Sequence, residues 1–132
     1  VVRRQLEPGP DHPIEITLKQ TPVQFILAGN AILSADAHFE LCEARYPPAI
    51  YLPREGISLA ALERSTHTSW CPYKGEAAYY HIRPASGARI ENELWTYENP
   101  FPAVREIKDA LAVYASKIDE IRIGSPSDSE EK

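Results

Sequence analysis

The sequence predicts a mainly β domain with antiparallel sheets and one helix near the C-terminus. Apolar and polar residues alternate in several short runs, as they do in strands with one face in water. The 132 residues include 12 prolines, about 9% against a typical ~5%, and this richness disfavours long helices. In only one stretch, close to the C-terminus, do apolar residues recur three and four positions apart, as on one face of a helix.

The first predicted strands cover residues 14–18, 23–27 and 31–35. In the first two, apolar residues occupy alternate positions, which is typical of a half-buried strand. Gly29 and Asn30 tolerate a positive φ, so we expect the second and third strands to form a hairpin.

Further extended segments are expected in the middle of the chain. The strand at residues 38–41 ends before Pro47-Pro48, because proline cannot donate to a strand ladder. A turn is expected at residues 71–75, where Pro72 fixes φ and Gly75 permits a positive φ, and another at Ser86-Gly87. The remaining predicted strands cover residues 49–52, 66–70, 77–83 and 89–97.

The predicted helix begins at Pro102, a residue that suits the first turn. The β-branched Val113 and the run at residues 121–123 weaken its far end, so the helix should stop near Asp119, with a break around residues 108–110 left open. Its apolar stripe comprises Val104, Ile107, Leu111, Tyr114, Ile118 and Ile121.

The domain organisation follows from length and local composition. A chain of this length suits one domain. Residues 1–12 are charged and contain two prolines, so we expect a flexible N-terminal arm. Residues 13–124 should form the single folded domain, and the serine-rich residues 125–132 a disordered acidic tail.

Charge and cysteine content exclude several classes of partner. The 14 basic and 19 acidic residues give a net charge of −5, which disfavours nucleic acid and anionic membranes as partners. No apolar run approaches the ~18 residues of a membrane span. Cys42 and Cys71 form neither a disulfide scaffold nor a Cys-x-x-Cys zinc knuckle, so we expect no metal, no cofactor and a cytoplasmic setting.

Three motifs together resemble one bacterial family. They are Tyr46-Pro-Pro-Ala-Ile-Tyr-Leu-Pro-Arg-Glu55, then Cys71-Pro-Tyr-Lys-Gly75 with Ala78-Tyr-Tyr80, and Trp95-Thr-Tyr-Glu-Asn-Pro100. From about residue 22 to residue 118, the chain is similar to the bacterial domain of unknown function family 427. Members carry P-P-x-x-Y-x-P-R-E, C-P-x-K-G-x-A-x-Y and W-x-Y-x-x-P.

The resemblance implies a β-tent-like architecture, in which two antiparallel sheets meet at an angle, but no assigned reaction. The family is sometimes labelled nucleotidyltransferase-like. Such enzymes hold Mg²⁺ and a triphosphate with a Gly-Ser turn and an Asp-x-Asp pair. Here the nearest acidic motif is Asp128-Ser-Glu130, in the predicted tail, and we therefore do not expect that activity.

Cys71 and Lys74 are the candidate reactive pair. A tight turn would bring the ammonium close to the sulfur and favour the thiolate, which predicts a catalytic nucleophile or redox thiol. The alternative is a buried Cys71 acting as a small hydrophobic residue beside a solvated lysine. On a straight strand His67 would lie roughly 13 Å from Cys71 and could not serve as its base.

Arg54 and the motif tyrosines are the candidate ligand-binding residues. Arg54 follows a rigid proline and could bind a carboxylate or phosphate, or instead pair with a nearby glutamate. Tyr79 and Tyr97 are expected near a cavity, whereas Tyr80 and Trp95 are expected in the core. The predicted ligand-binding set is Arg54, Lys74, Tyr51, Tyr73, Tyr79 and Tyr97.

Three functional hypotheses follow. The leading hypothesis is a domain that binds a small molecule in an aromatic cleft with a cationic rim. The second is a thiol-dependent enzyme that uses Cys71. The third is an interaction module without a pocket, whose edge strands pair in a homo-oligomer.

Overall fold

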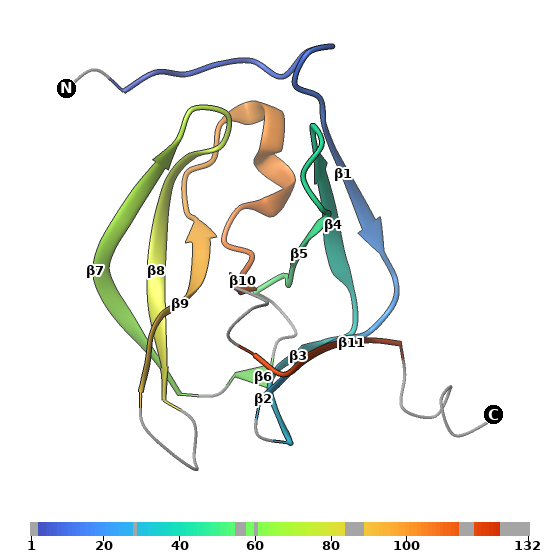
Figure 1. Ribbon diagram of the computed structural model, residues 1–132, viewed down its shortest axis with the longest axis vertical. Helices are drawn as coiled ribbons and strands as arrows, with labels where there is room; N and C mark the ends of the chain where they lie inside the picture. The colour runs from blue at the N-terminus through green and yellow to red at the C-terminus, as the bar shows by residue number, and fades with distance from the viewer. Residues whose placement is uncertain are drawn as a thin grey trace.

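The computed structural model describes residues 3–27, 29–54, 58–59, 61–83, 89–113 and 118–124. Within these ranges the chain forms three antiparallel sheets (Figure 1), which confirms the predicted mainly β fold class. The first sheet is β1 (Ile14–Lys19), β4 (His38–Glu43) and β5 (Ala49–Tyr51), in that order. The second is β10 (Ala112–Val113), β9 (Ile90–Tyr97), β8 (Gly75–Arg83) and β7 (Ala61–Cys71). The third is β11 (Glu120–Ile123), β2 (Val23–Leu27), β3 (Asn30–Ala35) and β6 (Ser58–Leu59).

The first and second sheets stand opposite each other, and the third sheet lies across their lower end (Figure 1). This arrangement agrees with the tent-like architecture that the resemblance implies. Each predicted strand before residue 98 is found in extended structure. In β8, Glu76 is exposed between the buried Gly75 and Ala77, as expected for a strand whose neighbouring residues point to opposite faces. Residues 77–79 are all buried, so both faces of β8 are covered there.

Two hydrophobic clusters hold the sheets together. The lower cluster joins the third sheet to β8, β9 and β10, and includes the fully buried Phe25, Leu33 and Leu94. The upper cluster joins β4 and β5 to β8 and β9, and includes Leu41 and Tyr51. Burial of each large apolar side chain contributes about 1.5–3 kcal/mol, so these clusters fix how the first two sheets face each other.

Both turns predicted from glycine chemistry within the described residues are present. Gly29 has φ +79° between β2 and β3, which confirms the hairpin. Gly75 has φ +110° at the start of β8, directly after the turn at residues 72–74. A Cβ atom at Gly75 would lie 3.4 Å from the backbone oxygen of Asn99, so glycine suits this position for both its backbone conformation and its close contact.

The C-terminal helix is much shorter than predicted. Its first turns form a 3₁₀ helix, η1 (Pro102–Ile107), and a break at residues 108–110, which the sequence left open, is present at Asp109, whose φ is +62°. The expected continuation to Asp119 is wrong, because β10 and β11 occupy residues that should have been helical or just beyond the helix end.

Strand pairing explains the difference. Leu52 and Leu111 exchange two backbone hydrogen bonds of 2.8 Å, which ties the segment after η1 to the end of β5. Val113 then pairs with Leu94 of β9. The apolar stripe correctly marked Val104, Ile107 and Leu111 as buried, but strand pairing rather than helix periodicity directs the later side chains inward.

Some expectations lie outside the described residues, namely the turn at Ser86-Gly87, the stripe residue Tyr114 and the acidic tail at residues 125–132. The domain boundaries stay a prediction. In the part of the chain that the structure describes, no helix has the length and apolar character needed to cross a membrane.

Candidate functional site

A cavity of about 220 Å³ lies between the first and second sheets. Its walls come from β4 and the loop after it, β5, the end of the β7–β8 turn, β8 and β9. The lining residues are Leu41, Glu43, Tyr46, Pro47, Ala49, Tyr51, Lys74, Tyr79, Trp95 and Tyr97.

Strand register brings these side chains together. On β4, Leu41 and Glu43 are two residues apart and therefore share a face. On the opposite sheet, Tyr79 of β8 is the register partner of Trp95 of β9. Tyr97, two residues beyond Trp95, lies on that same face, so an aromatic wall faces a wall that carries a carboxylate.

Lys74 and Glu43 form a buried ion pair across the cavity. The Lys74 Nζ atom lies 2.6 Å from Glu43 Oε1, and the two side chains are only 10% and 14% exposed. Lys74 Nζ also lies 3.7 Å from Cys71 Sγ. The other carboxylate oxygen of Glu43 accepts a 2.7 Å hydrogen bond from His12 Nε2. Both oxygens of Glu43 are therefore engaged by basic side chains.

The electrostatics of this pair favour two full charges. Burial raises the pKa of Glu43, but hydrogen bonds from Lys74 and His12 outweigh burial and leave that pKa below its ordinary value. Burial lowers the pKa of Lys74, but the hydrogen bond to Glu43 and the nearby Cys71 and Tyr51 leave it above its ordinary value. Carboxylate and ammonium thus remain charged at neutral pH and compensate each other.

The tyrosine hydroxyls in the cavity differ in their partners. The Tyr51 hydroxyl accepts a 3.4 Å hydrogen bond from Trp95 Nε1, and the Tyr79 hydroxyl pairs with Ser69 Oγ at 2.9 Å. Tyr97 is 7% exposed, and its hydroxyl makes no hydrogen bond to any residue that the structure describes. Burial, and then the neighbouring Tyr51 and Cys71, raise the pKa of Tyr97 far above its ordinary value, so this hydroxyl keeps its proton.

The N-terminal segment contacts the cavity residue Glu43 through His12, which does not itself line the cavity. The His12 ring stacks on Tyr73 with a centroid separation of 3.9 Å. Further along the segment, the backbone N–H of Leu6 donates to the Pro72 oxygen, and Trp70 Nε1 donates to the Arg4 oxygen, both at 2.9 Å. His12, at the end of the expected arm, therefore contributes a hydrogen bond to Glu43. The flexibility of residues 1–12 stays a prediction.

The structure brings four of the six predicted ligand-binding residues to the cavity, namely Lys74, Tyr51, Tyr79 and Tyr97. Cys71 is not among the lining residues but lies next to Lys74 and packs on the upper cluster.

Arg54 and Tyr73 lie outside the cavity walls. Arg54 Nε donates to the Asp109 backbone oxygen at 3.2 Å, and its guanidinium lies over the Tyr80 ring. Tyr73 turns instead toward His12. Trp95, expected in the core, packs on the upper cluster and also lines the cavity.

Six lining residues were not in the predicted ligand-binding set, namely Leu41, Glu43, Tyr46, Pro47, Ala49 and Trp95. The signal for Glu43 was present in the alternation Phe39, Leu41, Glu43, which places a carboxylate in register with two apolar residues. A charged residue at such a position needs a buried partner. The partner, Lys74, lies 31 residues away in the turn between β7 and β8, so the pairing could not be found from local sequence.

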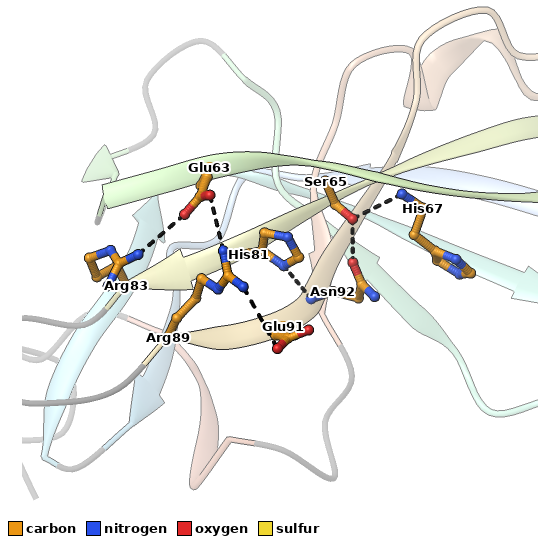
Figure 2. Close-up of polar contacts among 8 residues, drawn as sticks. All are labelled: Glu63, Ser65, His67, His81, Arg83, Arg89, Glu91 and Asn92. Atoms are coloured by element: carbon orange, nitrogen blue, oxygen red, sulfur yellow. Dashed lines mark hydrogen bonds and ion pairs between the residues drawn. The ribbon is translucent and has the colours of Figure 1, made fainter.

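A second polar cluster lies on the β7–β8–β9 sheet, beside a register irregularity in β7 (Figure 2). Ser65 Oγ donates to Asn92 Oδ1 at 2.5 Å and accepts from the His67 backbone N–H, and the Asn92 backbone N–H donates to His81 Nδ1. Glu63 pairs with Arg83 and Arg89. These groups largely satisfy one another. Among the described residues, no three His, Cys, Asp or Glu side chains are placed to hold a metal ion.

A family model described as a domain of unknown function (DUF427) matches residues 15–124. The match includes every residue that lines the cavity. No curated protein matches the chain. The description of the family assigns no reaction, so function has to be inferred from the geometry of the site.

Proposed function

The chain belongs to the family described as domain of unknown function DUF427, and we propose that this domain binds a small molecule in the cavity between its first and second sheets. One observation carries the proposal. Aromatic side chains from both sheets surround a hollow of about 220 Å³ that also contains a buried ion pair. Ligand sites typically combine apolar and aromatic walls with a few fixed polar groups.

The position of the polar groups supports binding rather than packing alone. Lys74 is 8% exposed and is held by Glu43 rather than by solvent. Fixed charges and hydroxyls beside rigid rings can orient a ligand without first losing side-chain freedom. Three of the aromatic residues, Tyr79, Trp95 and Tyr97, are held by neighbouring strands of one sheet, so this wall is formed before any ligand arrives.

A fragment screen by ligand-observed NMR tests the proposal. The blocking variant is Ala49→Leu, because Ala49 lines the cavity and faces Leu41 on the neighbouring strand. A matched control is Ala103→Leu, which adds the same side chain at an exposed position of η1. We expect fragments that bind the wild-type protein to bind the control equally and to lose at least about tenfold in affinity for the blocked variant.

The contrary outcome is clear. If the blocked variant remains folded and binds every detected fragment as the wild type does, the cavity is not the binding site. Cross-peaks of the Trp95 indole and of the cavity tyrosines should also shift on binding, whereas those of Tyr73 should not, because Tyr73 lies outside the walls.

Thiol chemistry at Cys71 is a second candidate, favoured by the 3.7 Å separation between Cys71 Sγ and Lys74 Nζ. A neighbouring ammonium stabilises a thiolate. The test is the rate of iodoacetamide alkylation against pH in the wild type and in Lys74→Gln, with Cys42 replaced by serine in both. Alkylation no faster than that of free cysteine, and unchanged by the lysine substitution, would remove this candidate.

A homo-oligomer formed through sheet edges is the least supported alternative. That hypothesis assumes a module without a pocket, whereas the structure contains a cavity. The exposed edge strand β1, with Leu18 50% exposed, is the surface that such pairing would use. Light scattering coupled to size-exclusion chromatography measures the mass directly, and a monomer across the accessible concentration range would exclude this alternative.

A further inference from the structure

We propose that the cavity selects uncharged, flat molecules with a hydrogen-bond acceptor, and that the Tyr97 hydroxyl donates to that acceptor. The inference rests on the proposed function and specifies the class of ligand. It departs from the cationic rim expected from the sequence, because the structure shows how the wall charges are already used.

The charges of the wall are paired within the protein. Lys74 Nζ contacts Glu43 Oε1 at 2.6 Å and Cys71 Sγ at 3.7 Å. Glu43 Oε2 is occupied by His12 Nε2 at 2.7 Å. The ammonium and the carboxylate therefore each have a protein partner of opposite charge or a hydrogen-bonding neighbour.

A charged ligand would have to compete with this pair. An anion that approached Lys74 would meet Glu43 at the same site, and a cation that approached Glu43 would meet Lys74. Because both side chains are at most 14% exposed, solvent screens this competition weakly. Moving an unpaired charge into such a site also costs its hydration. The paired wall therefore disfavours ligands of either sign.

Tyr97 supplies the remaining specific contact. Lys74, Glu43, Tyr51, Tyr79 and Trp95 all have hydrogen bonds within the protein. Among the buried polar side chains of the wall in the described part of the chain, the Tyr97 hydroxyl has no such partner. A neutral phenol donates one hydrogen bond and prefers an acceptor when it is buried. A ligand carbonyl or ring nitrogen would provide that acceptor.

The size and the walls of the cavity restrict the ligand further. Its volume of about 220 Å³ is roughly seven times the ~30 Å³ share of a water molecule in the liquid. It is also below the ~300 Å³ at which pockets for drug-sized molecules begin. The rings of Tyr51, Tyr79, Trp95 and Tyr97 favour a flat apolar body by stacking or edge contacts. A single substituted ring is therefore the expected size.

Three probes with one ring and different charge test the inference, namely benzamide, benzoate and benzylammonium. Dissociation constants are measured by ligand-observed NMR titration at neutral pH on the full chain. We expect benzamide to bind at least about tenfold more tightly than either charged probe. Glu43→Gln removes the compensating carboxylate, and in this variant benzoate should gain affinity relative to benzamide.

Tyr97→Phe tests the hydrogen bond, with Tyr80→Phe as the matched control. Tyr80 lies outside the cavity walls, and its hydroxyl accepts from Arg64. We expect Tyr97→Phe to weaken benzamide binding roughly threefold to tenfold and to leave the binding of toluene, which has no acceptor, unchanged. The control should leave the binding of benzamide unchanged.

Benzoate or benzylammonium binding to the wild-type protein as tightly as benzamide would overturn the inference, while the cavity would still be a binding site. Equal loss of benzamide and toluene affinity in Tyr97→Phe would also overturn it. If none of the three probes binds, the ligand class is wrong, and the broader fragment screen with Ala49→Leu decides separately whether the cavity binds at all. The wild-type ranking and the tyrosine variants keep the test decisive if Glu43→Gln does not fold.

Discussion

Two polar clusters differ in how completely their hydrogen bonds are satisfied: one lies on the β7–β8–β9 sheet, and the other lines the cavity between the first and second sheets. In the cluster of Figure 2, Ser65 both donates to Asn92 and accepts from the His67 backbone. Asn92 in turn donates through its backbone to His81. In the cavity, the Lys74–Glu43 pair is equally well satisfied, but a hollow of about 220 Å³ remains and the Tyr97 hydroxyl has no partner among the described residues.

This difference is the reason why we propose the cavity, and not the cluster of Figure 2, as the binding site. A closed network of short hydrogen bonds holds strand irregularities in place and leaves nothing for a ligand to satisfy. Asn92, for example, has φ +53° beside a register shift between β8 and β9. A hollow with a donor that lacks a partner gives a ligand both space and a specific contact. Histidines and a serine in the first cluster are therefore weaker functional indicators than the tyrosine in the second.

The largest expected effect comes from breaking the buried pair in the cavity. Glu43→Ala leaves Lys74 and His12 without their carboxylate, and loss of one partner of a buried pair costs about 3 kcal/mol of unfolding free energy. Urea denaturation monitored by tryptophan fluorescence measures this change.

The stability loss in Glu43→Ala is compared with that in Glu63→Ala, a variant in the cluster of Figure 2. Glu63 is 47% exposed and pairs with Arg83 and Arg89 at the surface, where ion pairs contribute little. Its removal should therefore change stability far less than Glu43→Ala. Equal losses in the two variants would mean that Lys74 and Glu43 are no more isolated from solvent than surface side chains.

Acid titration of stability separates the same two carboxylates. The pKa of Glu43 is below its ordinary value in the folded state, so the stability that it contributes is present above its unfolded-state pKa. That contribution is lost as the pH falls through the folded-state pKa. We expect the unfolding free energy of the wild type to decline below about pH 4, and Glu43→Gln to show a shallower decline.

High salt provides the control for the acid titration. Desolvation raises the pKa of Glu63, but its neighbours Arg89 and Arg83 together outweigh desolvation and leave that pKa below its ordinary value, and the group is exposed. Its contribution to the acid slope should disappear at high ionic strength, whereas that of Glu43 should persist, because buried pairs are screened much less. A Glu43-dependent slope that vanishes in salt would contradict the burial of the pair.

Alternation of apolar residues predicted β1, β2 and β4 because it reports directly on a half-buried sheet. Turn residues, apolar runs and strand-favouring residues predicted β3, β5, β7, β8 and β9, whereas β6 was not predicted. The same kind of pattern failed after Ile107. The stripe at Val104, Ile107 and Leu111 marks burial correctly, but it does not distinguish a helix from a chain that turns at Asp109 and then pairs with β9. Aspartate tolerates a positive φ better than most residues do, but this tolerance does not by itself predict that the chain turns at Asp109.

The sequence motifs located part of the site because two of them lie on neighbouring strands of one sheet. Lys74, Tyr79 and Tyr97 lie in motifs whose strands are neighbours in one sheet, so their proximity follows from local register. Arg54 belongs to an equally compact motif but turns toward Asp109. Glu43 and His12, which complete the charge arrangement, come from outside the motifs. Contacts between segments that are distant in the sequence decide these cases, and the sequence contains no local signal for which partner each of these side chains meets.

The smallest stability effect is expected from Tyr97→Phe, and its comparison with Ser65→Ala gives the clearest contrast between the two clusters. Ser65→Ala leaves Asn92 Oδ1 and the His67 backbone N–H without their hydroxyl, and should cost about 1–2 kcal/mol of unfolding free energy. It should leave benzamide binding unchanged. Tyr97→Phe removes a hydroxyl without a partner in the described protein, so its cost should be at most about 0.5 kcal/mol, although binding weakens.

We therefore expect Ser65→Ala to lower the unfolding free energy without weakening benzamide binding, and Tyr97→Phe to weaken benzamide binding with little change in the unfolding free energy. Urea denaturation and NMR titration on the same preparations measure both quantities, and a difference of about 1 kcal/mol in unfolding free energy is well resolved by the first method. A Tyr97→Phe variant destabilised as much as Ser65→Ala would show that the Tyr97 hydroxyl has a structural role, in which case the cavity would resemble the closed cluster and lose its distinguishing donor. A stable Tyr97→Phe variant with weakened binding assigns that donor to ligand recognition, because a group that contributes nothing to folding but strengthens binding acts on the ligand alone.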